Sequence, residues 1–198
     1  DELKEALTDL KQKGMTELIL DLRGNPGGYL SQAVDIADLF IDGKKKIVYT
    51  EGRREDTNEE YFASKPSAYE KITLIVLINH GSASASEIVS GAIQDWDRGL
   101  ILGETSFGKG LVQRQFTLPD NSAIRLTISE YYTPSGRLIQ REYKDKKKSE
   151  EYYPEILDSL KEGDNTDHQV EKDSTKPLFK TEGGRTVYGG GGITPDFI

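Results

Sequence analysis

The 198-residue sequence contains no cysteine, which excludes disulfide bonds, zinc–thiolate sites and cysteine nucleophiles. It contains only two histidines, His80 and His168, so histidine-based catalysis has few candidate residues. No apolar run is long enough to span a membrane, and no signal peptide is visible. Because the sequence starts inside an amphipathic helix pattern, we expect it to be one domain of a longer protein.

Apolar residues are also scarce, since 35% of the residues are hydrophobic and 30% are charged. The net charge of -8 argues against a general nucleic-acid binder, which would need a basic surface. Regular periodicity fades between residues 141 and 182, where Lys, Glu and Asp dominate. We therefore predict one domain with a core of residues 1–140 and 183–198, interrupted by a charged surface insertion at 141–182.

The rest of the sequence alternates between helical and strand patterns. Helical spacing predicts helices near residues 3–10, 33–40 and 84–97, and short apolar runs predict strands near 18–22, 47–50, 72–78, 100–102, 111–118 and 123–132. The run at 18–22 is typical of an internal strand that is covered on both faces, whereas 51–60 predicts an exposed loop. This order favours an α/β fold with a mixed, mostly parallel sheet and helices packed outside it.

The most informative stretch is 74–89, which predicts a strand, a tight turn of small residues and a helix. Such a turn can direct the Ser84 hydroxyl and backbone N–H groups to one point at the positive end of the helix dipole. The structural alternative is that Ser84 and Glu87 form a Ser-x-x-Glu capping box that merely closes the helix start. This stretch alone leaves both interpretations open.

A nucleophilic serine needs a base. His80 shares the turn with Ser84 and would have to fold back on its own loop, and His168 lies in the charged segment, so both are poor candidates. A lysine can act as a base where burial disfavours its ammonium form. Lys109 is the best candidate because it lies between glycines in an otherwise apolar setting, although a solvated loop lysine remains the alternative.

Two glycine-containing loops need an interpretation. Gly103-x-x-x-x-Gly108-Lys109 resembles a phosphate-binding P-loop, but Gly110 stands where Ser or Thr is required and a strand pattern follows instead of a helix. We therefore reject nucleotide binding. The loop at 24–28 offers unobstructed backbone N–H groups that suit an oxyanion hole, or it is an ordinary strand-to-helix turn.

Several motifs in this order resemble peptidase family S41, the C-terminal processing (tail-specific) peptidases. They comprise DLRGNPGG at 21–28, SASASEI at 82–88, GETSFGKGLVQ at 103–113, LTI at 126–128, YYTPSGR at 131–137 and GGITPD at 191–196. The resemblance spans about the whole chain except the charged segment. It implies a ClpP/crotonase-like core that hydrolyses peptide bonds by a Ser-Lys mechanism.

The resemblance also implies the roles of individual residues. It makes Ser84 the nucleophile, Lys109 the general base and Gln113 the residue that orients the lysine. The N–H groups of Gly28 or Gly27, together with Ala85, would form the oxyanion hole, and Asp95 would have a supporting role. In an extended strand Gln113 projects to the same face as Lys109, and its amide can accept a hydrogen bond without adding charge. No metal or other cofactor is required.

The resemblance further implies polypeptide substrates, a PDZ domain in the parent protein outside this sequence, and an extracytoplasmic location such as the periplasm. It is compatible with membrane anchoring of the parent protein and with a homo-oligomer. Two other functions remain to be tested: a catalytically silent peptide-binding module on the same scaffold, and an acyl-CoA enzyme of the crotonase type.

Overall fold

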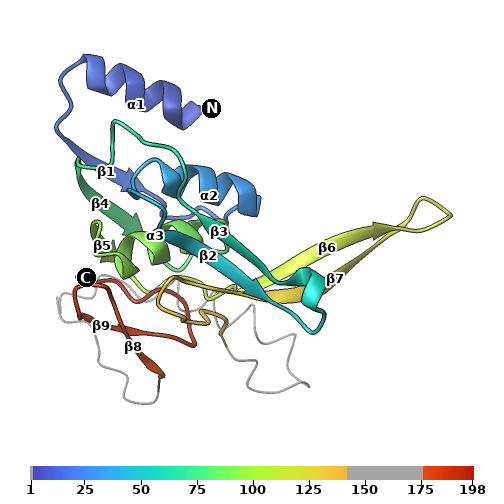
Figure 1. The fold of residues 1–198 in the computed structure, drawn as a ribbon. Coiled ribbons are helices and arrows are strands. Elements are labelled where there is room, and N and C mark those ends of the chain that lie inside the picture. Colours follow the sequence, from blue (N-terminus) through green and yellow to red (C-terminus); the bar gives the residue numbers. More distant parts are fainter. Residues whose placement is uncertain (1, 142–175) are drawn as a thin grey trace.

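The computed structural model describes residues 2–141 and 176–198, and Figure 1 shows their arrangement. Helical and extended segments alternate along the first hundred residues, and strands dominate afterwards. In chain order the elements are α1 (Glu2–Gln12), β1 (Glu17–Asp21), α2 (Leu30–Asp38), β2 (Lys46–Glu51), the 3-10 helix η1 (Glu55–Thr57), β3 (Glu59–Phe62), β4 (Thr73–Ile78), α3 (Ala85–Asp95), β5 (Leu100–Gly103), β6 (Leu111–Thr117), β7 (Ala123–Tyr132), β8 (Leu178–Lys180) and β9 (Thr186–Tyr188).

A three-stranded parallel sheet, in the order β1-β4-β5, forms one layer of the fold. Parallel neighbours need a crossover connection, and α3 provides it between β4 and β5. Alternate residues of the central strand face the helices, so Val76 and Ile78 are fully buried while Leu77 is only half-buried. Helix α3 buries Ile88 and Ile93 in the same core. The predicted α/β architecture with a parallel sheet and packed helices is confirmed.

A second sheet is antiparallel, in the order β3-β2-β7-β6. Helix α3 contacts β5 on one side and β2 on the other, so it lies between the two sheets. Beyond β2, the strands β6 and β7 continue as a hairpin that projects from the core (Figure 1). The structure thus differs from the predicted single mixed sheet, because β7 pairs with β2 and not with a parallel strand. The predicted loop at 51–60 also contains η1 and the start of β3.

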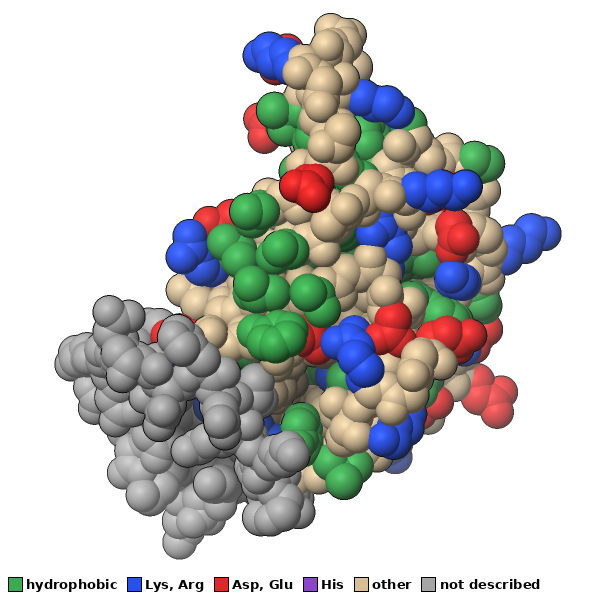
Figure 2. Space-filling view, turned by 90° about the vertical axis from the view of Figure 1, so that its left-hand side faces the viewer, with side chains coloured by type: hydrophobic (Ala, Val, Ile, Leu, Met, Phe, Trp, Pro, Cys, Tyr) green, Lys and Arg blue, Asp and Glu red, His purple; other side chains and the backbone are tan. Residues whose placement is uncertain are grey.

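The outer face of the parallel sheet is apolar and exposed in the described part of the protein. The register places Ile19, Ile75 and Leu100 in one row on this face. Ile19 is 63% exposed and β1 is an edge strand of this sheet, so the prediction of an internal strand covered on both faces is wrong. Figure 2 shows hydrophobic side chains gathered on this side of the molecule.

The C-terminal segment returns to the core, as its sequence predicted. Ile193 is fully buried, and Phe197 forms a parallel bridge with Leu102 of β5. Part of the segment assigned to the charged insertion, residues 176–182, is described. It contains β8, which pairs with β9, and the Glu182 N–H donates to the Asp95 carbonyl at 2.8 Å. Residues 142–175 lie outside the described residues, so the domain boundaries stay a prediction.

Candidate active site

Ser84 lies at the tight turn between β4 and α3, at the N-cap position of the helix. Its backbone has φ 52° and ψ -111°, a conformation that is rare for a residue with a side chain and contrasts with the extended backbone of an ordinary N-cap. Non-glycine residues in such regions store strain and are frequent at functional sites. A sharp strand-to-helix turn of this kind presents a serine hydroxyl at the end of the sheet.

The capping interpretation is also partly correct. The Glu87 carboxylate accepts the Ser84 N–H at 2.8 Å, the return bond of a capping box. Ser84 therefore begins the helix and occupies a strained turn at the same time. The cap position does not exclude a chemical role.

The glycine loop after β1 lies directly against this turn. The Asn25 carbonyl accepts the Ala83 N–H and the Ser86 hydroxyl, both at 3.0 Å. A β-carbon on Gly27 would lie 2.5 Å from the Ala83 carbonyl oxygen and 2.6 Å from the Ala85 nitrogen. Since Gly27 also has φ +89°, only glycine fits this close approach between the two loops.

The two glycines at this loop differ in the state of their N–H groups. Gly27 donates to the Asn25 side-chain oxygen at 2.9 Å, so its N–H is already used. Among the hydrogen bonds within residues 2–141 and 176–198, none is donated by the N–H of Gly28 or of Ala85. These two groups are the available donors for an oxyanion, whereas the sequence left Gly27 and Gly28 as alternatives.

Lys109 lies in the loop that connects β5 to β6 and returns to the start of α3. Its N–H donates to the Glu87 carboxylate at 2.9 Å, and the neighbouring Gly108 N–H does the same at 2.7 Å. The Tyr131 hydroxyl lies within hydrogen-bond distance of the carbonyls of both Lys109 and Ser84 and shares its single proton between them. The structure therefore brings together the backbones of two residues that lie 25 positions apart in the sequence.

The side chains themselves are less tightly connected. Lys109 and Ser84 are both half-buried, and within the described residues no hydrogen bond joins the lysine ammonium to the serine hydroxyl. Gln113 lies in β6 and is exposed, without a hydrogen bond to Lys109 in this part of the chain. A register shift between Val112 and Gln113 interrupts the strict alternation of faces on which the same-face prediction depended.

Within the described residues, His80 makes no hydrogen bond to Ser84. The His80 ring lies 3.7 Å from the Glu104 carboxylate, on the side of the loop after β5. His168 falls outside the described residues. No group of three or more His, Cys, Asp or Glu side chains in the described ranges could hold a metal ion. In the same ranges, no helix has the length and apolar character needed to cross a bilayer.

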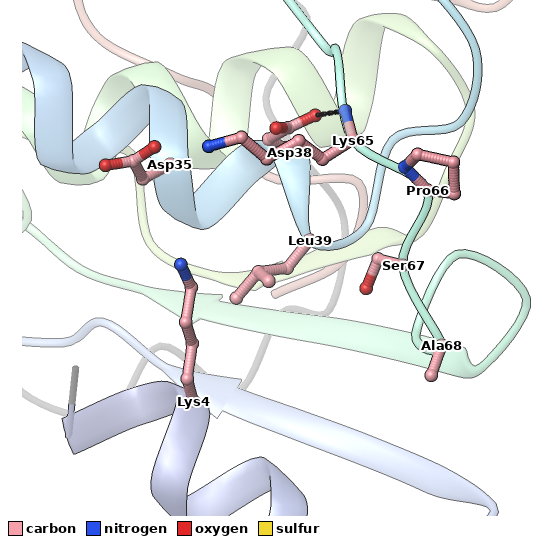
Figure 3. Close-up of a pocket in the computed structure, with 8 residues that line it drawn as sticks. All are labelled: Lys4, Asp35, Asp38, Leu39, Lys65, Pro66, Ser67 and Ala68. Atoms are coloured by element: carbon pink, nitrogen blue, oxygen red, sulfur yellow. Dashed lines mark hydrogen bonds between the residues drawn. The ribbon is translucent and has the colours of Figure 1, made fainter.

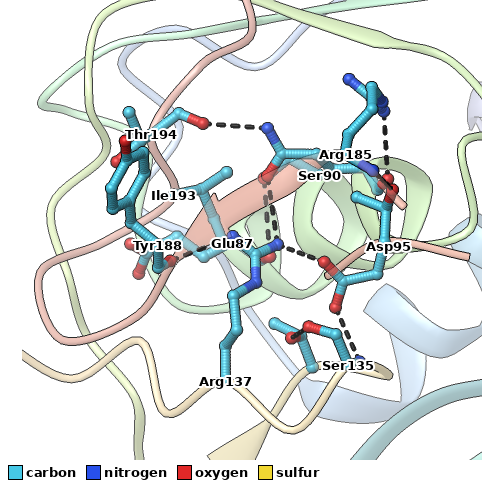
Figure 4. A network of polar contacts seen from close by, with 12 residues as sticks. Glu87, Ser90, Asp95, Ser135, Arg137, Arg185, Tyr188, Ile193 and Thr194 are labelled. Atoms are coloured by element: carbon cyan, nitrogen blue, oxygen red, sulfur yellow. Dashed lines mark hydrogen bonds and ion pairs between the residues drawn. The ribbon is translucent and has the colours of Figure 1, made fainter. Parts of the chain in front are cut away.

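Asp95 lies at the opposite end of α3 from Ser84. The two positions are eleven residues apart in the sequence, which corresponds to about 16 Å at the usual helical rise. Its carboxylate is buried and pairs with Arg137 at 2.5 Å, and it also accepts the Ser135 N–H at 2.9 Å. Figure 4 shows this network, which lies at the far end of the helix. In this structure Asp95 connects structural elements and does not approach the serine.

A pocket on the other side of the molecule lies between α1, α2 and the segment after β3, and Figure 3 shows its lining. The Asp38 carboxylate at this pocket accepts the Ser64 N–H at 2.8 Å and the Lys65 N–H at 3.4 Å. These bonds satisfy the Asp38 carboxylate within the fold, so this side chain has a structural role. The chemistry of the protein is better placed at the Ser84 turn.

Sequence reasoning missed three residues that build this site. Glu87 was noted only as a possible cap partner, yet it also binds the Lys109 loop. Tyr131 and Asn79 were not singled out, although the Asn79 side-chain oxygen accepts the N–H of Gly24 at 2.8 Å and of Gly81 at 3.0 Å. The only available signal was their position inside or beside the motifs.

A strained serine at a strand-to-helix turn, with two backbone N–H groups available beside it, is the arrangement of a serine hydrolase. The family comparison is consistent with this class. The sequence model of peptidase family S41 matches residues 1–146. The chain belongs to this family, and the resemblance stated from its motifs is confirmed.

Named relatives support the family. The chain is 47% identical over 143 residues to a carboxy-terminal-processing protease of Bartonella bacilliformis, covering 70% of this chain and 33% of that protein. It is 40% identical over 140 residues to the carboxy-terminal processing protease CtpA of Bacillus subtilis, covering 71% and 30%. The chain thus spans about a third of the length of these relatives.

Solved structures agree with the sequence relatives. A photosystem II D1 C-terminal processing protease superposes with a TM-score of 0.63 at 37% identity, covering 70% of this chain and 35% of that one. An S41 protease from Bacteroides fragilis, with a TM-score of 0.61 at 22% identity over 69% of this chain and 38% of that one, shows the shared fold.

Proposed function

We propose that this chain is the catalytic core of a serine endopeptidase that cleaves polypeptides near their C-termini. Membership of family S41 supports peptide hydrolysis, and the names of the relatives support the position of cleavage. The single observation that carries the proposal is the convergence at Ser84: a strained nucleophile turn, the available N–H groups of Gly28 and Ala85, and the adjacent backbone of Lys109.

In the proposed mechanism Ser84 Oγ attacks the scissile carbonyl carbon while its proton passes to Lys109 Nζ. The N–H groups of Gly28 and Ala85 stabilise the negative charge that develops on the carbonyl oxygen, a contribution typically worth about 2.7 to 4 kcal/mol per donor. Collapse of the tetrahedral intermediate breaks the C–N bond, and the leaving amine takes the proton from Lys109. Water then hydrolyses the acyl-enzyme on Ser84.

Lys109 and Gln113 have to move for this reaction. Catalytic hydrogen bonds are often long in the absence of substrate and shorten only in the productive complex. We assign Gln113 the role of holding the Lys109 ammonium once both side chains have turned toward Ser84. In this proposal, binding of substrate orders the site by bringing both side chains to Ser84.

The finer description of the fold belongs to the same proposal. We assign the core to the ClpP/crotonase-like class and residues 141–182 to a charged insertion within the same domain. This chain covers only about a third of each relative, which fits a parent protein with a further domain. We propose that this further domain is a PDZ domain that selects substrate C-termini. We further propose an extracytoplasmic location.

A fluorophosphonate probe tests this function most directly. We expect one molecule of probe to phosphonylate the Ser84 hydroxyl with loss of fluoride, as peptide mapping would show. We expect Ser84→Ala to abolish both labelling and hydrolysis of an unstructured peptide. Labelling at another serine would contradict the assignment. Peptide binding without hydrolysis or labelling would instead identify the silent binding module, and turnover of a CoA thioester would identify a crotonase-type enzyme.

A further inference from the structure

Glu87 is the third residue of α3, and its side chain is fully buried. Its carboxylate accepts four hydrogen bonds, two on each oxygen. One oxygen accepts from the Ser106 hydroxyl at 2.6 Å and the Gly108 N–H at 2.7 Å. The other oxygen accepts from the Ser84 N–H at 2.8 Å and the Lys109 N–H at 2.9 Å.

This set of bonds exceeds what a helix cap requires. A capping-box glutamate needs only the N–H of the N-cap residue, which here is Ser84. The other three donors belong to residues 106–109, about twenty positions further along the chain. Glu87 therefore connects the turn that carries the serine to the loop that carries the lysine.

The connection has an energetic cost. Burial raises the pKa of Glu87 above its ordinary value, and the four hydrogen bonds oppose that shift. All four donors are neutral groups, so they compensate desolvation without the attraction of a cation. An apolar side chain would be easier to bury at this position, but it could not hold four N–H and O–H groups at fixed points.

Tyr131 complements Glu87 from the carbonyl side. Its ring is buried, and its single hydroxyl proton is shared between the Lys109 carbonyl and the Ser84 carbonyl, the latter at 3.1 Å. Glu87 and Tyr131 together hold the N–H and the carbonyl of both residues. The separation of the two backbones is thereby fixed, and only side-chain rotation remains for Lys109 to reach Ser84.

We propose that Glu87 and Tyr131 are positioning residues that set the distance between the nucleophile Ser84 and the base Lys109. This inference rests on the proposed function of those two residues. Neither positioning residue exchanges a proton with substrate. They act by pre-organising the two reacting groups, and misplacement of such groups by about 1 Å can cost about 100-fold in rate.

Glu87→Gln is the sharpest test because it keeps the shape of the side chain. Whichever way the amide faces, its NH₂ group meets two donors and both of those hydrogen bonds are lost. We expect kcat on an unstructured peptide to fall about 100-fold with KM within threefold of the unsubstituted protein. We also expect amide hydrogen exchange to become at least about tenfold faster at Gly108 or at Lys109, whichever of the two faces the NH₂ group.

Ser90→Ala is the matched control, since Ser90 is a buried polar residue one turn further along α3 that bonds only to helix carbonyls. It should leave kcat and exchange in the 106–109 loop unchanged. A merely structural Glu87 would lower the melting temperature of the Gln variant without changing kcat of the folded protein. A folded Glu87→Gln variant with kcat within threefold of the parent would overturn the proposal.

Two further measurements keep the result decisive. If Glu87→Gln fails to fold, Tyr131→Phe is the second variant, because it removes only one hydroxyl group. We expect Tyr131→Phe to lower kcat tenfold or more. An unchanged kcat would overturn the proposal. If the unsubstituted protein shows no Ser84-dependent turnover, the proposed function fails. Hydrogen exchange then decides separately, because unchanged exchange at Gly108 and Lys109 in the Gln variant contradicts the positioning role.

Discussion

The two ends of helix α3 use buried polar residues in opposite ways. At its N-terminal end Glu87 is bound by neutral donors, Ser84 is strained, and the N–H groups of Gly28 and Ala85 have no acceptor within the described residues. At its C-terminal end the buried carboxylate of Asp95 is paired with an arginine.

Arg137 is the centre of the C-terminal end. Its guanidinium is completely buried and donates to Asp95, to the Gln94 side-chain oxygen at 3.1 Å and to the Tyr188 carbonyl at 3.1 Å (Figure 4). Burial lowers the pKa of Arg137, and Asp95 opposes that shift. Nearby, Arg185 pairs with both Asp97 and Asp196, so the end of the helix is also joined to the C-terminal segment.

One helix therefore carries both a site with unused backbone donors and a network in which the buried charges are paired. Unused donors and backbone strain reduce stability, and they persist only where the surroundings determine the geometry. The paired network provides such surroundings by fixing the far end of α3 to three other segments. This arrangement suggests that Asp95 supports catalysis by holding the helix, at a distance, and not by contact with the reacting groups.

The largest expected effect is the loss of activity at the N-terminal end. Ser84→Ala and Lys109→Ala should each lower kcat on an unstructured peptide by about 10⁴- to 10⁶-fold, because each removes a partner of one proton transfer. Urea unfolding should show the free energy of unfolding changed by less than about 1 kcal/mol. Lys13→Ala, at an exposed position directly after α1, is the control and should retain full activity. Substantial turnover by the Lys109 variant would eliminate it as the base.

At the C-terminal end the largest effect should be on stability. Asp95→Asn leaves the Arg137 charge buried without its counterion and should lower the free energy of unfolding by about 3 to 5 kcal/mol in urea titrations. Activity of the folded fraction should stay within threefold of the parent. Replacing both residues by apolar ones, as in Asp95→Leu with Arg137→Met, should recover much of the loss. A stable Asp95→Asn protein with a large kcat defect would show that Asp95 has a direct catalytic role.

Gly27→Ala tests how closely the glycine loop must approach the Ser84 turn. The added methyl group would overlap the Ala83 carbonyl, so we expect kcat to fall about 100-fold as Gly28 moves away from the oxyanion position. Gly14→Ala is the matched control, because Gly14 has nearly the same φ, +90°, but no atom within 4 Å of the added carbon. It should cost about 1 kcal/mol of stability and no activity. Equal activity of both variants would refute the close-approach requirement.

The N-terminal end of α3 was largely predictable from sequence, and the C-terminal end was not. The strand, turn and helix at 74–97 follow from local periodicity, which each residue carries in its own sequence neighbourhood. The loops that hold Gly28 and Lys109 could be recognised because glycine clusters mark special backbone conformations. Their proximity to Ser84 came from the family resemblance and not from the pattern.

Long-range polar pairs cannot be recognised from local sequence patterns in the same way. Asp95 and Arg137 are 42 positions apart, and nothing in the local sequence of either identifies the other. The four hydrogen bonds of Glu87 were not predicted, because a capping box already accounted for a glutamate at this position. The division into two sheets was missed for a similar reason, since strand periodicity reports which face is buried and not which strand is the partner.

The smallest expected effect concerns an exposed Asp–Arg pair that can be compared with Asp95 and Arg137. Asp21 is the last residue of β1 and Arg23 follows it, and hydrogen bonds from Arg23 lower the pKa of Asp21 from 3.8 to about 2. A carboxyl group with a lowered folded-state pKa stabilises the fold above its unfolded pKa and loses that contribution as the pH falls from about 4 to about 2.

Arg23→Ala should therefore return the pKa of Asp21 toward 3.8, which an NMR titration of its carboxyl carbon would measure. The accompanying change in unfolding free energy at pH 7 should be far smaller than for Asp95→Asn, because solvent screens the exposed pair. Arg53→Ala, at an exposed position elsewhere, should leave the Asp21 titration unchanged. If Asp21 still titrated near 2 without the Arg23 side chain, the backbone hydrogen bond of the turn would be what lowers its pKa. The exposed ion pair would then no longer be a valid comparison for the buried pair of Asp95 and Arg137.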